Sequence, residues 1–152
     1  MWEILVVHVG RIADEGFRRG IERYASMVGG GWRIRDEAVS GSRRKDPAAL
    51  RLEETRALLR RVPKESVAIA MDQAGERMDS PSFARLMASY KDRGRRVAFL
   101  VGGAHGLDRK ELGETRKLSL SDMTYPHELA TLMLMEQIYR ANASCAGKAY
   151  AK

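Results

Sequence analysis

EILVVHV, residues 3–9, is the stretch that decides the fold, because it is a nearly continuous apolar run. Strands of this kind are buried on both faces, as they are in parallel sheets that helices cover on both sides. Two later runs, SVAIAMD at 66–72 and RRVAFLVGG at 95–103, have the same character. Together the three runs predict the buried strands of a largely parallel sheet.

Two further segments predict strands in less buried positions. WRIRDEAV at 32–39 alternates polar residues with Trp32 and Ile34, so we expect this strand at or near an edge of the sheet. KLSL at 117–120 predicts one more short strand.

Segments with helical spacing separate these strands. Asp14 is placed to cap a helix that carries Phe17, Ile21, Tyr24 and Val28 on one face. The other predicted helices run from Pro47 to about Arg61, from Ser80 to Gly94, over 108–116 and over 126–142. Strands that alternate with helices predict an α/β fold, and 152 residues fit a single domain.

Composition narrows the class of protein. Hydrophobic residues make up 44% of the chain and no apolar run reaches the roughly 20 residues of a membrane span, which predicts a soluble globular protein. The opening residues MWEILVVHVG include Glu3 and no cationic segment, so they predict a strand rather than a secretory signal, and we expect a cytoplasmic protein. A lone Cys145 and three scattered histidines give no disulfide and no metal-binding spacing.

The chain is basic, with 27 Lys and Arg against 20 Asp and Glu and a net charge of +7. Such a charge favours a polyanionic partner, with nucleic acid as the natural candidate, although a basic protein can also be merely soluble. Two arginine-rich groups are candidate RNA-docking surfaces or, alternatively, plain solvated faces. They are Arg18, Arg19 and Arg23 in the first helix and Arg43, Arg44 and Lys45 in the loop after the second strand.

Ligands of parallel sheets bind beyond the carboxyl ends of the strands, which directs attention to three loops after Met71, Val101 and Leu120. The second loop belongs to VGGAHGL at 101–107, a glycine-rich turn that lets backbone amides approach a ligand. It matches neither GxGxxG nor GxxxxGK, so neither a dinucleotide site nor a P-loop is supported, and a purely structural turn is the alternative. A nucleotide-dependent oxidoreductase therefore lacks its expected motifs.

The third loop belongs to LSLSDMTYPHEL at 118–129. Its backbone donors and acceptors can bind the edge of a purine while its leucines and methionines cover the faces. The alternative is that Ser121, Asp122 or Thr124 only caps the helix that starts at Pro126, and both roles can coexist.

The last predicted helix is apolar around most of its circumference, which indicates deep burial or a subunit interface, and we expect a homodimer. Its apolar residues are Leu129, Ala130, Leu132, Met133, Leu134, Met135, Ile138 and Tyr139.

Three segments in order, FLVGGAHGL, LSLSDMTYPHEL and EQIYRA, in a chain that starts VVHVGRIADEGFRRGIERY, resemble the RlmH family of the SPOUT superfamily. These bacterial methyltransferases modify N3 of a pseudouridine in large-subunit (23S) ribosomal RNA. The resemblance covers nearly the whole chain and is strongest from 97 to 142. It implies one SPOUT domain over residues 1–152, a trefoil knot at about 97–152, a homodimer and the ribosome as partner.

The resemblance also implies S-adenosylmethionine as cofactor and assigns its binding residues. The matching positions are Met71, Gly103, Ser121, Asp122, Met123, Thr124, Tyr125 and Pro126. In the implied reaction, the imide nitrogen of the modified uracil attacks the sulfonium methyl, so the protein mainly aligns the atoms and favours the deprotonated imide. His105 is either the proton acceptor or an exposed loop histidine without a catalytic role.

Arg140 matches the arginine of the family's Tyr-Arg motif, and we assign Arg140 and Tyr150 as catalytic residues, with a salt bridge at the helix end as the alternative for Arg140. Two positions depart from the family pattern. The usual Pro-Tyr-His ending is replaced by AYAK, with Ala151 in place of the histidine, and Thr131 replaces an arginine that we place on an RNA-facing surface. Because of these two changes, the alternative is a protein that binds RNA or the cofactor but methylates little.

Overall fold

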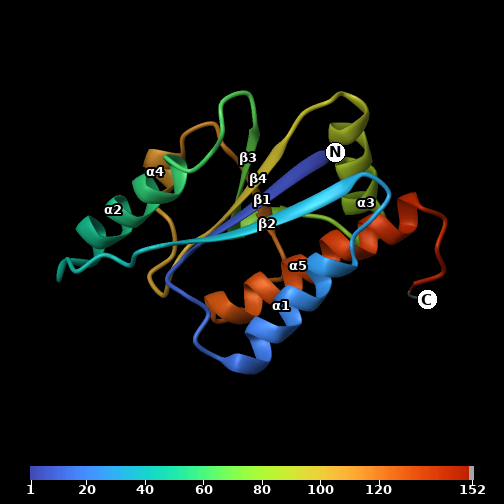
Figure 1. Cartoon of the computed structure of the whole chain (residues 1–152). Coiled ribbons are helices and arrows are strands. Elements are labelled where there is room, and N and C mark those ends of the chain that lie inside the picture. Colours follow the sequence, from blue (N-terminus) through green and yellow to red (C-terminus); the bar gives the residue numbers. More distant parts are fainter. Residues whose placement is uncertain (151–152) are drawn as a thin grey trace.

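The computed structural model describes residues 1–150 and alternates strands with helices along the whole chain (Figure 1). The elements are β1 (Trp2–Val9), α1 (Glu15–Met27), β2 (Trp32–Val39), α2 (Pro47–Leu59), β3 (Val67–Arg77), α3 (Ser80–Asp92), β4 (Val97–Val101), α4 (Arg109–Leu112), β5 (Arg116–Ser119) and α5 (His127–Cys145).

The five strands form one sheet in the order β2-β1-β4-β3-β5, and every pair of neighbours is parallel. This confirms the predicted α/β class and the edge position of β2. The apolar strands β1 and β4 occupy the interior, and β4 is buried at all five of its residues. The sequence therefore placed its most apolar runs where helices cover both faces.

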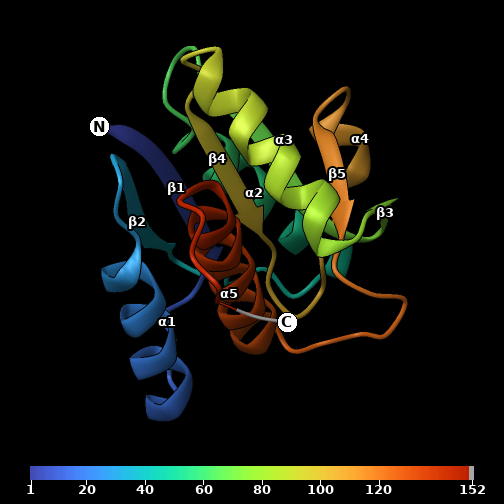
Figure 2. The same cartoon turned by 90° about the vertical axis from the view of Figure 1, so that its right-hand side faces the viewer.

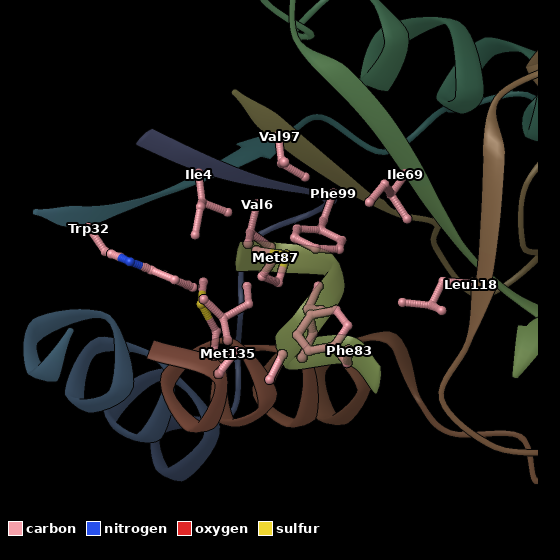
Figure 3. Close-up of a cluster of buried hydrophobic side chains, with 14 of the residues drawn as sticks. Ile4, Val6, Trp32, Ile69, Phe83, Met87, Val97, Phe99, Leu118 and Met135 are labelled. Carbon is pink, nitrogen blue, oxygen red and sulfur yellow. The ribbon is translucent and has the colours of Figure 1, made fainter. Parts of the chain in front are cut away.

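The helices divide into two layers (Figures 1 and 2). Helices α1, α3 and α5 cover one face of the sheet, where Ile4, Val6 and Phe99 pack against Phe83 and Met135 (Figure 3). Helices α2 and α4 cover the opposite face, where a second apolar cluster contains strand residues as well as Leu58 and Leu112.

Aspartates cap four of the helices. Asp14, Asp46 and Asp79 each accept a hydrogen bond from the backbone N–H three residues later, at 2.8–2.9 Å, and Asp108 caps α4 in the same way. The cap of α1 confirms the prediction for Asp14. Such a cap satisfies one of the backbone donors that a helix start leaves unpaired.

Several element boundaries differ from the prediction, three of them by three residues or more. Strand β3 continues to Arg77 past an irregularity between Met71 and Glu76 and does not end near Asp72. Helix α4 spans only four residues because Gly113 adopts a φ of 54° and ends it, whereas the sequence predicted a helix over 108–116. Helix α5 runs to Cys145, three residues beyond the predicted end.

No helix within the described residues 1–150 is long and apolar enough to cross a membrane.

Candidate functional site

The carboxyl ends of β4, β3 and β5 lie next to one another because these strands are neighbours in a parallel sheet. Met71 in β3 is in register with Val101 of β4 and with Leu118 of β5. Beyond these ends the structure has a cleft of about 900 Å³. The three loops that the sequence singled out therefore meet at one place, as expected for ligand sites of open α/β sheets.

All of the predicted cofactor-binding residues except Asp122 line this cleft. They are Met71, Gly103, Ser121, Met123, Thr124, Tyr125 and Pro126. The carboxylate of Asp122 instead pairs with Arg77 at 2.5 Å, and the side chain is exposed. The backbone carbonyl of Asp122 accepts a hydrogen bond from Gln73, which does line the cleft.

The glycine-rich turn forms the wall beside β4. The N–H of Gly106 donates to the carbonyl of Gly103 at 3.0 Å, and Gly106 adopts a φ of 76°. A Cβ on Gly103 would lie 3.1 Å from Oε1 of Glu54 and 3.3 Å from Cγ1 of Val9. Because α2 and β1 pack so closely behind it, glycine at 103 lets the turn keep its place against the sheet.

Gln73 holds the loop after β5 with both ends of its amide. Its Nε2 donates to the carbonyl of Asp122, and its Oε1 accepts from the Thr124 hydroxyl at 2.9 Å. Within the loop, the N–H of Met123 donates to Oγ of Ser121 at 3.0 Å. Sequence reasoning missed Gln73, although it directly follows the predicted end of the strand at 66–72, and in the structure it lies within the longer β3.

The suggested capping role of this loop is wrong. Helix α5 starts after Pro126, which has no side chain that could accept a hydrogen bond from the helix start. The side chains of Ser121 and Thr124 make their hydrogen bonds to Met123 and Gln73 instead. These two side chains therefore order the loop itself.

Asp72 and Arg109 form an ion pair in the wall of the cleft that the sequence analysis did not anticipate. Nε of Arg109 lies 2.8 Å from Oδ2 of Asp72, and Nη2 lies 3.0 Å from Oδ1. Burial by itself would raise the pKa of Asp72, but the hydrogen bonds from Arg109 and from the N–H of Ala74 outweigh it and lower that pKa. The bidentate pair ties the middle of β3 to the start of α4.

Arg140 and Tyr150, the predicted catalytic residues, lie together but do not line the cleft. The Arg140 guanidinium lies 5.3 Å from the centre of the Tyr150 ring and 2.5 Å from Oε1 of Glu136. Burial, the Tyr24 hydroxyl and the Glu136 carboxylate raise the pKa of Tyr150 to about 12. Within one chain these residues form a C-terminal cluster, which includes the salt bridge considered for Arg140.

The two predicted RNA-docking groups lie on different helical layers. In α1, Arg18 and Arg19 form ion pairs with neighbouring glutamates, whereas Arg23 has no ion pair within residues 1–150. In the loop before α2, Arg44 pairs with Glu53 at 3.1 Å. The structure therefore does not join the two groups into one surface.

Two other assignments concern single side chains. His105 is exposed at the tip of the glycine-rich turn and lines the cleft. Thr131 is fully buried, and its hydroxyl donates to the carbonyl of His127 at 2.8 Å. The prediction that position 131 faces RNA is therefore wrong for the surface of this chain. Ala151, the other departure, lies outside the described residues.

No group of three or more His, Cys, Asp or Glu side chains that could hold a metal ion occurs in the part of the chain that the structure describes.

Comparison with known proteins adds an independent finding. The family described as "Predicted SPOUT methyltransferase" matches residues 2–150. A protein named ribosomal RNA large subunit methyltransferase H from Geotalea daltonii is 33% identical over 147 residues, which are 95% of this chain and 96% of that protein. Two further relatives carry the same name. The protein from Gluconacetobacter diazotrophicus is 38% identical over 95% of this chain and 94% of its own length. The protein from Gemmatimonas aurantiaca is 33% identical over 98% of this chain and 99% of its own length. This chain therefore belongs to the SPOUT methyltransferases, in the RlmH family that its sequence resembles.

Proposed function

We propose that this protein transfers a methyl group from S-adenosylmethionine to N3 of a pseudouridine in the 23S RNA of the large ribosomal subunit, in the cytoplasm. One observation carries the proposal: the ends of three neighbouring strands bring Met71, Gly103 and Ser121 to a single cleft in a chain of a methyltransferase family. The relatives' names supply the class of RNA.

The cleft fits this cofactor in size and chemistry. A volume of about 900 Å³ lies in the range of small-molecule sites, roughly 300–1,000 Å³. Val101, Leu107 and Leu120 provide apolar surface for the faces of an adenine ring. The backbone between Ser121 and Thr124 offers the donors and acceptors that an adenine edge and a ribose require.

When bound, S-adenosylmethionine supplies a methyl group on a sulfonium, which is a good leaving group. The protein's part would be to hold the uracil N3 against the methyl group, so that the N–C bond could form as the S–C bond breaks. The N3 proton must also leave, and the exposed His105 at the cleft is the candidate acceptor, unless it is a loop histidine without a catalytic role. The loops that would provide this alignment are held by Gln73 and by the Asp72–Arg109 pair.

A homodimer belongs to the proposal. Leu129, Leu132 and Met133 on α5 are only half-buried in the single chain. Leu132 and Met133 border a second cleft of about 550 Å³ together with Tyr24, and a partner subunit would cover this apolar face. Because Arg140 and Tyr150 do not reach the cleft of their own chain, a catalytic role requires that a second subunit presents them.

The single domain over residues 1–152 and the trefoil knot at about 97–152 stay predictions from the resemblance. What supports them is the family match across residues 2–150.

Two experiments test the methyltransferase. Isothermal titration of the purified protein with S-adenosylmethionine should show binding, and no heat at millimolar cofactor would contradict the proposal. Mass spectrometry of ribosomal RNA from a deletion strain should show the loss of one methyl group on a large-subunit pseudouridine. Cofactor or RNA binding together with unchanged methylation would instead favour the alternative, a SPOUT protein that binds but barely methylates, in which Ala151 has removed a functional histidine.

A further inference from the structure

Four side chains that line the cleft can carry positive charge: Arg51, His105, Arg109 and His127. Arg109 is committed to Asp72 through two hydrogen bonds. Arg51, in the second turn of α2, has neither a carboxylate within 4.0 Å nor a side-chain hydrogen bond among residues 1–150. Its guanidinium is therefore the permanent charge of the cleft that is left available for an anion.

The loop before α2 carries further unpaired positive charge. Arg43 and Lys45 are exposed, and neither forms an ion pair within the described part of the chain. Glu54, one turn after Arg51, anchors this loop because its Oε2 accepts a hydrogen bond from the N–H of Ser42 at 2.9 Å. The rim of the cleft and the basic loop are thus held by the same helix, at the left of Figure 1.

We propose that Arg51 binds a phosphate group of the RNA strand that carries the target nucleotide, an inference that rests on the proposed function. A base that enters the cleft brings its own backbone phosphates to the rim, and a guanidinium binds phosphate through paired N–H donors. The carboxylate of the cofactor is the other anion that could reach the cleft. It would neutralise Arg51 but leave Arg43 and Lys45 without a partner, whereas an RNA strand engages all three.

The test replaces Arg51 by glutamine and compares it with Arg60→Gln. Arg60 ends the same helix, is exposed and has no ion pair among residues 1–150, so the control makes the same charge change away from the cleft. Binding to unmethylated large ribosomal subunits is measured across a salt series, together with cofactor affinity by titration. The unfolding midpoints of both variants in urea show that they fold.

For Arg51→Gln we expect affinity for the ribosomal subunit and 1/KM for RNA to fall about tenfold. The slope of log K against log salt should decrease in magnitude by about 0.7 to 0.9, the value of one lost phosphate contact. Cofactor affinity and kcat should stay within about twofold of the wild type, and Arg60→Gln should change none of these quantities as strongly.

Two results would overturn the inference. A weakened cofactor affinity with an unchanged salt slope would assign Arg51 to the cofactor's carboxylate. If Arg51→Gln and Arg60→Gln weakened RNA binding equally, the effect would come from the general charge of the protein and not from a phosphate contact of Arg51. The binding measurement needs no methyl transfer, so it decides the role of Arg51 even if the wild-type protein proves inactive, which would count against the proposed function alone.

Discussion

His8 is a titratable side chain in the middle of the sheet, with only 2% of its surface exposed. Nδ1 lies 2.7 Å from the carbonyl of Gly10, and Nε2 lies 3.0 Å from the Asp36 carboxylate on β2. Burial opposes the charged form, but the Asp36 carboxylate and the Gly10 carbonyl outweigh it and raise the pKa of His8 above 6.5, with a small contribution from Glu128. The native state therefore binds this proton more tightly than the unfolded chain does.

This raised pKa makes stability depend on pH. The stabilisation by protonated His8 is complete below the unfolded pKa of about 6.5 and is lost as pH rises through the higher pKa of the folded state. We therefore expect the free energy of unfolding, measured in urea at fixed protein concentration, to fall over that range. Asp36→Asn should flatten this dependence. If Asp36→Asn showed the same pH dependence of the unfolding free energy as the wild type, His8 would not be the cause of that dependence.

Loss of the Gln73 side chain should loosen the loop at 121–124 without unfolding the protein. Gln73→Ala removes both hydrogen bonds to the loop at 121–124, so the cofactor must bind a loop that it first has to order. Two lost bonds of about 1 kcal/mol each predict a cofactor affinity about 10- to 30-fold weaker in calorimetric titration. Gln137→Ala also removes two side-chain hydrogen bonds, to Ser80 and to Glu136, outside this cleft, and should leave the affinity unchanged.

At the scale of elements, the junction of β3 and β5 positions the cleft. Gly75 passes so close to β5 that a Cβ would lie 2.7 Å from the backbone N of Leu118. Since backbone atoms cannot rotate away, Gly75→Ala must shift β5 and the loop that carries Ser121. We expect a loss of about 1–3 kcal/mol in unfolding free energy, measured in urea, together with weaker cofactor binding.

Gly29→Ala is the matched control for that substitution. A Cβ at Gly29 meets no atom within 4 Å, and its φ is not in the left-handed region, so the change should alter stability by less than about 1 kcal/mol. If both variants lost the same stability, steric contact with β5 would not be the reason for glycine at 75.

The same junction shows why the sequence predicted part of the fold and not the rest. The apolar runs of β1 and β4 are local signals, so burial and strand type followed from them. The extension of β3 past Gly75 depends on contact with Leu118, which is 43 positions away in the chain, and no periodicity encodes such a contact. Likewise the cleft loops were predicted from strand ends and from the family resemblance. The hydrogen bonds of Gln73 to the loop after β5 and the Asp72–Arg109 pair were not predicted, because they join residues that only the folded sheet brings together.

At the scale of the whole molecule, each active site of the proposed dimer would combine the cleft of one chain with the C-terminal cluster of the other. The cofactor loops of one chain form the cleft, while Arg140 and Tyr150 lie in a C-terminal cluster that does not line it. If the partner's Arg140 completes each cleft, a dimer of two differently damaged chains can regain one intact site. Arg140→Ala damages the cluster, and Gly103→Val damages the cleft through contact with Glu54 and Val9.

Coexpression of these two variants with different affinity tags isolates the mixed dimer. Arg140→Ala alone and Gly103→Val alone should each be inactive, whereas the mixed dimer should recover about half of the wild-type methyl transfer, because one of its two composite sites is whole. If Arg140 acted within its own chain, both sites of the mixed dimer would stay damaged. A mixed dimer as inactive as its parents would therefore place Arg140 outside the partner's cleft, and a purely monomeric wild type in light scattering would refute the composite site directly.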